Sequence, residues 1–169
     1  KFMLNLVSDM LTVSSIESGH IKLNYEFFDI TQLLNNIIKR QKLIANKKNI
    51  RIEFNFNEQV IINSDKNKLD QVFTNLISNA IKFSYPNTVI NILVSNLEKS
   101  ILVEVRDQGQ GVPPEEQELL FKPFQKTSAK STAGEPSTGL GLYIVKRIIE
   151  ASTGKIWVKS EVNKGSSFF

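Results

Sequence analysis

Hydrophobic residues recur at three- and four-residue intervals in four segments of the chain, and this spacing is typical of amphipathic helices. Asp29 or Thr31 can cap the second of these helices, and Ser64 or Asp65 the third, because their side-chain oxygens can accept hydrogen bonds from free backbone N–H groups. A short fifth helix is expected after Pro113, where acidic residues follow at the positive end. The four segments are residues 3–16, about 30–44, 66–83 and 139–151.

Short runs of apolar residues, some of them strictly alternating, predict strands between these helices. Residues 125–138 show no periodicity and are rich in Lys, Ser, Thr, Gly and Pro, so a mobile loop is expected there. Because several strands follow one another without an intervening helix, the pattern favours an open mixed sheet with helices on one face over a doubly wound parallel sheet. The expected strands are residues 51–56, 60–62, 89–94, 101–106, 155–162 and 166–169, and residues 21–28 form a connector with some strand character.

Length and composition exclude several classes of protein. The 169 residues are enough for one domain with a short appendage, and both ends are expected to be cut from a longer protein. The absence of cysteine excludes a disulfide scaffold, a thiolate zinc site and a thiol nucleophile. The net charge of +4 is scattered, with no basic stripe interleaved with aromatic residues, so no nucleic-acid partner is expected.

Three polar residues share one stripe of the helix predicted at 66–83. At about 100° per residue, Asn79 lies about 40° from Asn75, and Lys82 about 20° to the other side. An amide oxygen suits Mg²⁺ and a lysine suits phosphate. Taken alone, the stripe is also explained by a solvated polar face.

An acidic residue is predicted to be buried at the end of the strand 101–106. Alternation places Asp107 on the same face as Val103 and Val105, just before Gly109 and Gly111. A buried carboxylate needs hydrogen-bond donors, and the glycines allow the backbone to come close. This arrangement is typical of the floor of a small-ligand site, although a hairpin with a capping aspartate also accounts for it.

Gly139 and Gly141 stand at the start of the last predicted helix, where free N–H groups and the helix dipole favour an anion. The preceding loop brings Lys126 and Lys130. A simple tight turn explains the glycines alone. Together, however, the three features supply a Mg²⁺ ligand, an acceptor for an exocyclic amine and a phosphate-binding segment, which favours a nucleotide.

Four segments resemble the sequence boxes of the sensor histidine kinases. The resemblance covers about residues 30–169 and implies the GHKL (Bergerat) ATP-binding fold, a two-layer α/β sandwich with a mixed, mostly antiparallel sheet and helices on one face. Phe83 stands where this family often has tyrosine, and Ser137 where it often has glycine. The segments are Asn75–Ser84, similar to the N box, Asp107–Pro113, similar to the G1 box, Leu120–Phe124, similar to the F box, and Thr138–Leu142, similar to the G2 box.

The resemblance implies a role for each candidate residue, with ATP and Mg²⁺ as the cofactors. Asn79 would coordinate Mg²⁺ with Asn75 nearby, and Lys82 would meet a phosphate. Asp107 would accept the adenine amino group. The loop 125–138 would be the ATP lid, from which Lys126 or Lys130 could reach the γ-phosphate. The other implied nucleotide-site residues are Phe83 and Thr138, Gly109 and Gly111, which would shape the pocket, Phe121 and Phe124 as lid hinges, and Gly139, Leu140 and Gly141 at the phosphates.

Residues 7–19 resemble the tail of the second helix of the dimerisation and histidine-phosphotransfer bundle. The expected domains are therefore residues 1–28, the end of that helix with its connector, and residues 29–169, the catalytic ATP-binding domain. The phosphoacceptor histidine would lie on the first bundle helix, outside this chain, and His20 does not match the acceptor motif. The implied partners are the chain's own helix bundle, a second copy in a homodimer and a response-regulator receiver domain.

The expected function is therefore that of the ATP-binding catalytic part of a sensor histidine kinase in two-component signalling. This fragment is expected in the cytoplasm and not in a membrane, whether or not its parent is membrane-anchored. It is expected to bind ATP without phosphorylating itself. The alternatives are a nucleotide-sensing pseudokinase and another GHKL ATPase.

Overall fold

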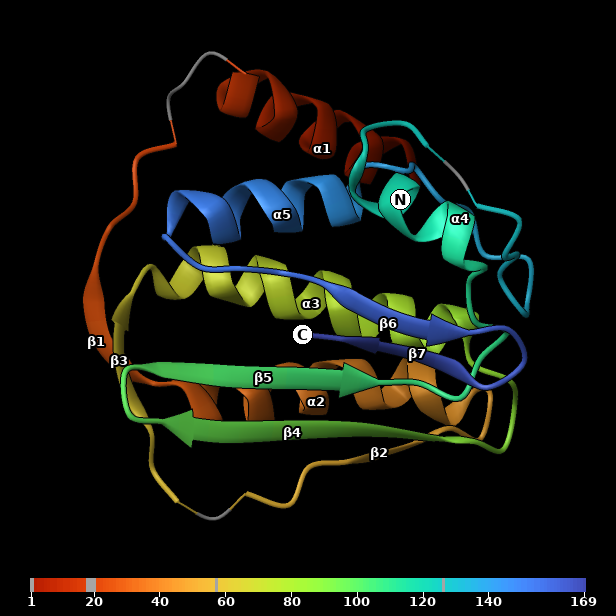
Figure 1. Cartoon of the computed structure of the whole chain (residues 1–169), viewed down its shortest axis with the longest axis horizontal. Helices are drawn as coiled ribbons and strands as arrows, with labels where there is room; N and C mark the ends of the chain where they lie inside the picture. The colour runs from red at the N-terminus through yellow and green to blue at the C-terminus, as the bar shows by residue number, and fades with distance from the viewer. Residues whose placement is uncertain (1, 18–20, 57, 126) are drawn as a thin grey trace.

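The structure is a computed structural model that describes residues 2–17, 21–56, 58–125 and 127–169. Helices and strands alternate irregularly along the chain (Figure 1). In chain order they are α1 (Phe2–Glu17), β1 (Glu26–Asp29), α2 (Ile30–Asn46), β2 (Arg51–Glu53), β3 (Ile61–Ser64), α3 (Lys66–Phe83), β4 (Val89–Leu97), β5 (Ser100–Arg106), α4 (Pro114–Gln117), the 3-10 helix η1 (Glu118–Phe121), α5 (Gly141–Ala151), β6 (Val158–Glu161) and β7 (Gly165–Phe168).

The main sheet has five strands in the order β2-β4-β5-β7-β6. Only β2 and β4 run parallel, and the other neighbours are antiparallel. β1 and β3 form a separate antiparallel pair. Figure 1 shows α2 and α3 behind the sheet, α5 beside α3, and α1 on the outer side of α5. The predicted mixed, mostly antiparallel sheet with helices on one face is confirmed.

Two aspartates fix where the sheet-covering helices begin. The Asp29 side chain accepts a hydrogen bond from the Thr31 backbone N–H (2.9 Å), and that of Asp65 from the Lys68 N–H (2.9 Å). Asp65 also accepts from the Asn24 N–H (2.9 Å), which ties the connector to α3. Of the two candidates at each start, Asp29 and Asp65 are therefore the caps.

The core lies between the sheet and the helices. Branched aliphatic side chains from both layers are fully buried in it, as the helical and strand periodicities require. α1 joins this core through Val13, which is 7% exposed, while Met3 and Leu11 on the same helix are 75% and 65% exposed. Core members include Leu34, Ile37, Ile77, Ile90, Ile92, Val105, Ile144 and Ile148.

Some predicted boundaries were wrong, each for a local reason. α5 begins at Gly141 and not at Gly139, because Gly139 has φ +72°, outside the right-handed helical region. β2 ends at Glu53 because its ladder with β4 ends there, although Phe54 and Phe56 continue to pack against the core. β6 begins at Val158, three residues later than predicted.

No helix in the described ranges combines the length and the hydrophobicity needed to cross a lipid bilayer.

Candidate functional site

A pocket that is partly open to solvent lies where the C-terminal half of α3 meets the segment after β5 and the loop 125–138. Four of the residues singled out in the sequence line it: Asn79, Phe83, Asp107 and Gly111. Most of the remaining wall is apolar. The other lining residues are Gln110, Val112, Leu120, Thr127, Ala129, Leu142, Ser166 and Phe168.

Asp107 is buried in this pocket, with 5% of the residue exposed. Its Oδ1 accepts hydrogen bonds from the backbone N–H groups of Gly109 (2.9 Å) and Ser166 (3.2 Å). Burial raises the pKa of Asp107 to about 6, against the lowering effect of these two hydrogen bonds. Among the described residues, no group donates a hydrogen bond to Oδ2 of Asp107. This oxygen can therefore accept a hydrogen bond from a ligand.

The glycines after Asp107 allow the chain to cross its own backbone. A Cβ at Gly109 would lie 2.3 Å from the carbonyl oxygen of Phe83. Gly111 has φ +69°, and a Cβ there would lie 2.0 Å from the carbonyl oxygen of Glu161. The segment therefore packs closely between the end of α3 and the end of β6, and this close packing holds Asp107 in place.

The three polar side chains on this stripe of α3 face three different neighbours. Asn79 lines the pocket. Asn75 instead faces the start of α5, because its Oδ1 lies 3.5 Å from the position that a Cβ of Gly141 would take. Lys82 points to the loop: its Nζ donates to the carbonyl oxygen of Pro136 (2.7 Å) and lies 5.3 Å from the centre of the Phe83 ring.

The two ends of the loop 125–138 are joined at its base. The Phe124 N–H donates to the carbonyl oxygen of Gly139 (3.1 Å), and both residues have positive φ, +58° and +72°. Phe121 packs edge-on against Phe168 of the pocket wall, with 6.4 Å between ring centres. The Lys130 backbone N–H donates to Oε1 of Gln110 (3.2 Å). Lys126 lies outside the described residues.

The segment before α5 contacts the first helix. The Thr138 hydroxyl donates to Oδ2 of Asp9 on α1 (3.1 Å) and accepts from the Leu140 N–H (3.3 Å). Burial raises the pKa of Asp9, partly offset by the hydrogen bond from Thr138. Leu140 itself is fully buried in the core. Leu140, like Gly139 and Gly141, is not among the residues that line the pocket.

Residues 64–169 match the family described as histidine kinase-, DNA gyrase B-, and HSP90-like ATPase. The chain belongs to this ATPase family. It is 34% identical over 163 residues to the sensor protein SrrB of Staphylococcus aureus, a match that covers 96% of this chain and 28% of SrrB. The chain therefore spans little more than a quarter of the curated relatives it matches.

Solved histidine kinases share the fold of this ATPase domain over almost its whole length. ShkA, solved in complex with AMPPNP, gives a TM-score of 0.83 at 27% identity, covering 99% of this chain and 35% of that one. ThkA, solved in complex with the response regulator protein TrrA, gives 0.76 at 26% identity, covering 98% and 47%. The chain is thus homologous to sensor histidine kinases.

The sequence did not reveal several residues that line the pocket. Ser166 and Phe168 alternate on β7, so their common face could have been predicted from the strand period. Gln110 stands between two glycines, and this position alone does not predict that it lines the pocket. Thr127 and Ala129 belong to an aperiodic loop whose course no local pattern fixes.

The side chains of the pocket do not suit a magnesium ion bound by the protein alone. They are better suited to a magnesium ion that binds together with a nucleotide. The described residues contain no cluster of three or more His, Cys, Asp or Glu side chains that could hold a metal. Asn79 offers an amide oxygen at the pocket wall, and Mg²⁺ commonly combines one or two protein oxygens with phosphates and waters.

Proposed function

We propose that this chain is the ATP-binding catalytic part of a sensor histidine kinase. In this proposal the γ-phosphoryl group of Mg·ATP passes to a histidine on a bundle helix outside the chain, and then to an aspartate of a response regulator. The observation that carries the proposal is the buried Asp107, whose carboxylate has a vacant acceptor in the same pocket as Asn79.

Each end of the pocket has its own chemistry in this proposal. At the base end Asp107 accepts a hydrogen bond from the adenine amino group, with Gly109 and Gly111 shaping the wall and Phe83 lining it. At the phosphate end Asn79 would hold Mg²⁺, which when bound neutralises phosphate charge.

The remaining phosphate contacts come from elements around the loop. Lys82 and Lys130 would supply positive charge, and Thr138, Gly139 and Gly141 would form the turn beside the phosphates, with Phe121 and Phe124 as hinges. The histidine nitrogen attacks the γ-phosphorus and ADP leaves, so the domain contributes positioning and charge stabilisation.

Residues 1–28 are, in this proposal, the end of the phosphotransfer helix with its connector, and residues 29–169 the ATP-binding domain. The exposed apolar side chains of α1 support this division, because a lone surface helix does not usually expose a row of them. A homodimeric bundle would cover that row, and the response regulator would dock on the intact protein. The exposed residues are Met3, Val7, Met10 and Leu11.

Nucleotide selectivity tests the adenine assignment. Guanine would aim a carbonyl oxygen at the Asp107 carboxylate where adenine offers an N–H. This mismatch costs about 2–4 kcal/mol, so we expect GTP to bind at least tens of times more weakly than ATP in calorimetric titrations. Equal affinities for the two nucleotides would contradict the assignment.

Phosphorylation assays test the kinase assignment against the nucleotide-sensing alternative. Incubated with γ-labelled ATP, this chain alone should stay unlabelled, His20 included, because the acceptor helix lies outside it. A longer chain that includes the preceding helix should become labelled on histidine. A longer chain that binds ATP but takes no label would favour a nucleotide-sensing module instead.

A further inference from the structure

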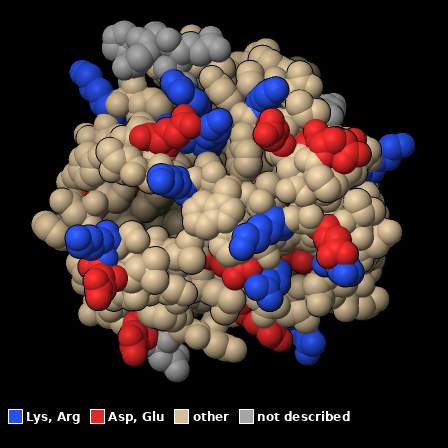
Figure 2. Space-filling view, viewed as in Figure 1, with Lys and Arg blue, Asp and Glu red and all other residues tan. Residues whose placement is uncertain are grey.

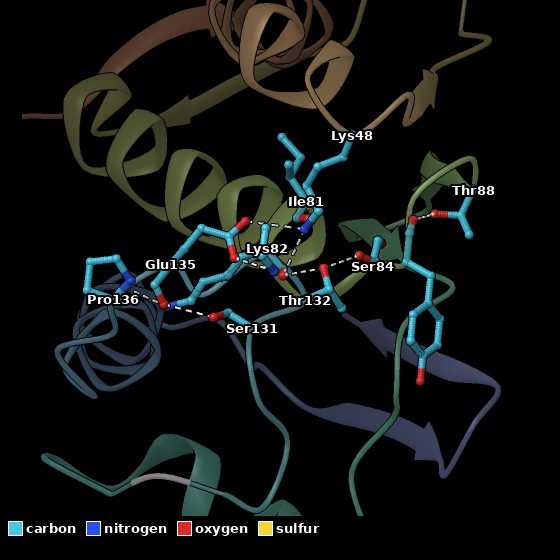
Figure 3. A network of polar contacts seen from close by, with 11 residues as sticks. Lys48, Ile81, Lys82, Ser84, Thr88, Ser131, Thr132, Glu135 and Pro136 are labelled. Atoms are coloured by element: carbon cyan, nitrogen blue, oxygen red, sulfur yellow. Dashed lines mark hydrogen bonds and ion pairs between the residues drawn. The ribbon is translucent and has the colours of Figure 1, made fainter.

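A buried lysine links the loop 125–138 to the end of α3. Lys48 lies in the turn between α2 and β2, and its side chain is 8% exposed. Its Nζ donates to the carbonyl oxygens of Ile81 (2.7 Å) and Lys82 (3.0 Å) in the last turn of α3. Its third contact is Oε1 of Glu135 in the loop, at 3.3 Å. An ammonium group has three N–H donors, and here each has an acceptor (Figure 3).

The end of α3 suits the positive charge of Lys48, and Lys48 in turn suits the negative charge of Glu135. The last carbonyls of a helix lack intrahelical partners and carry the negative end of its dipole, so a buried ammonium is stabilised there. On the loop side, burial alone would raise the pKa of Glu135. Hydrogen bonds from its own N–H, from Ala133 and from Lys48 bring that pKa below its usual value.

A second set of contacts attaches the same part of the loop to α3. The Thr132 N–H donates to the carbonyl oxygen of Lys82 (3.1 Å), and the Thr132 hydroxyl donates to that of Ser84 (2.7 Å). In return, Nζ of Lys82 donates to the carbonyl oxygen of Pro136 (2.7 Å). Figure 3 shows that these contacts flank the Lys48–Glu135 pair, so residues 131–136 are docked on the end of the helix that carries Asn79.

We propose that Lys48 is a positioning residue of the pocket, which holds the loop against α3 through Glu135 and thereby fixes the loop side of the pocket wall. That side consists of Thr127 and Ala129, a few residues before the docked part. The effect on nucleotide rests on the proposed function, whereas the effect on the loop does not.

A loop that lost this anchor would leave α3 more often, because only the contacts of Thr132 and Pro136 would still hold it there. A ligand that needs the wall would then have to order the loop on binding, and its affinity would fall by that conformational cost. Lys48 therefore acts on the site through the loop, without touching the ligand itself.

Glu135→Gln tests the proposal with little risk to folding, because it removes one charge from a loop side chain and keeps its shape. The Thr132 amide is the reporter, since its N–H bonds α3 only while the loop is docked. In nucleotide-free protein, we expect NMR hydrogen exchange of Thr132 to become about three- to tenfold faster, because a charge-assisted contact becomes a neutral one. The Ile50 amide, bonded to the carbonyl oxygen of Ala45 (3.0 Å), should keep its exchange rate.

Two further variants complete the experiment. Lys48→Met should accelerate Thr132 exchange at least as much, and if this variant does not fold, Glu135→Gln still decides. Glu118→Gln makes the same chemical change at an exposed position outside the loop and should leave Thr132 exchange at the wild-type rate.

Calorimetric titration with Mg·ATP provides the second measurement. We expect the Kd of Glu135→Gln to rise by about three- to tenfold, in step with the exchange of Thr132. An unchanged Thr132 exchange rate, or faster exchange with an unchanged Kd, would overturn the proposal. If the wild-type chain itself binds no Mg·ATP, the proposed function fails, while exchange without nucleotide still decides whether Lys48 positions the loop.

Discussion

The strongest prediction concerns Asp107, because its burial affects stability and binding in opposite directions. Folding raises its pKa from 3.8 to about 6, so the folded chain favours the protonated carboxyl. The stability that this group contributes is complete below pH 3.8 and is lost as the pH rises through about 6. Asp107→Asn keeps an oxygen for the Gly109 and Ser166 N–H groups and removes the titration.

The size of the effect follows from the pKa difference. At about 1.4 kcal/mol per unit, the ionised carboxylate lowers the free energy of unfolding at pH 7 by about 3 kcal/mol relative to low pH. About 1 kcal/mol of this is lost between pH 5 and pH 7. The stability advantage of Asp107→Asn over wild type should therefore be larger at pH 7 than at pH 5 by about that amount.

Urea unfolding of both proteins at the two pH values measures this difference, and comparing the two proteins cancels every titration they share. The same substitution should weaken ATP binding, because an asparagine amide can present an N–H to the adenine amino group. Titration with ATP measures this loss of affinity. Two results would refute the reasoning: a stability difference that does not change with pH, or an Asp107→Asn variant that binds ATP like the wild type.

Two further predictions use matched pairs of substitutions. Gly109→Ala should lower the free energy of unfolding in the urea assay by about 2–4 kcal/mol, because its Cβ would collide with the Phe83 carbonyl. Gly134 has φ +74° but lies in open space, so Gly134→Ala should lower it by only about 1 kcal/mol. Asn79→Ala should weaken Mg·ATP binding about tenfold through the loss of one polar contact, whereas Asn75→Ala, which faces α5, should weaken it much less. Equal effects within either pair would contradict the geometry.

Periodicity and polar placement were enough to predict the helices, the mixed sheet and the burial of Asp107. The helices, the strands and the burial of Asp107 depend on neighbours within one element, and the sequence displays such neighbours directly. The ladder of β2 and the start of α5 were misplaced because they depend on a partner strand and on the positive φ of Gly139, which tertiary packing selects.

The contacts of the loop lay beyond sequence reasoning for a different reason. Lys48 and Glu135 are 87 positions apart, and Asp9 and Thr138 are 129 apart, so no local spacing links them. Lys48 also follows another lysine in a turn, where a solvated side chain is the ordinary expectation. Only the fold shows that this lysine points inward, under the last turn of α3.

The two ends of the pocket are therefore built by different kinds of interaction. Beside Asp107 the backbone crosses itself at Gly109, Gly111 and Gly165, where a Cβ would lie 2.0–2.3 Å from a carbonyl oxygen, so a side chain at any of these positions would force the backbone to move. On the loop side the wall depends on a few hydrogen bonds and one ion pair, each worth about 1 kcal/mol. If the proposed function holds, loop substitutions should therefore alter nucleotide affinity, whereas substitutions of these glycines should alter stability.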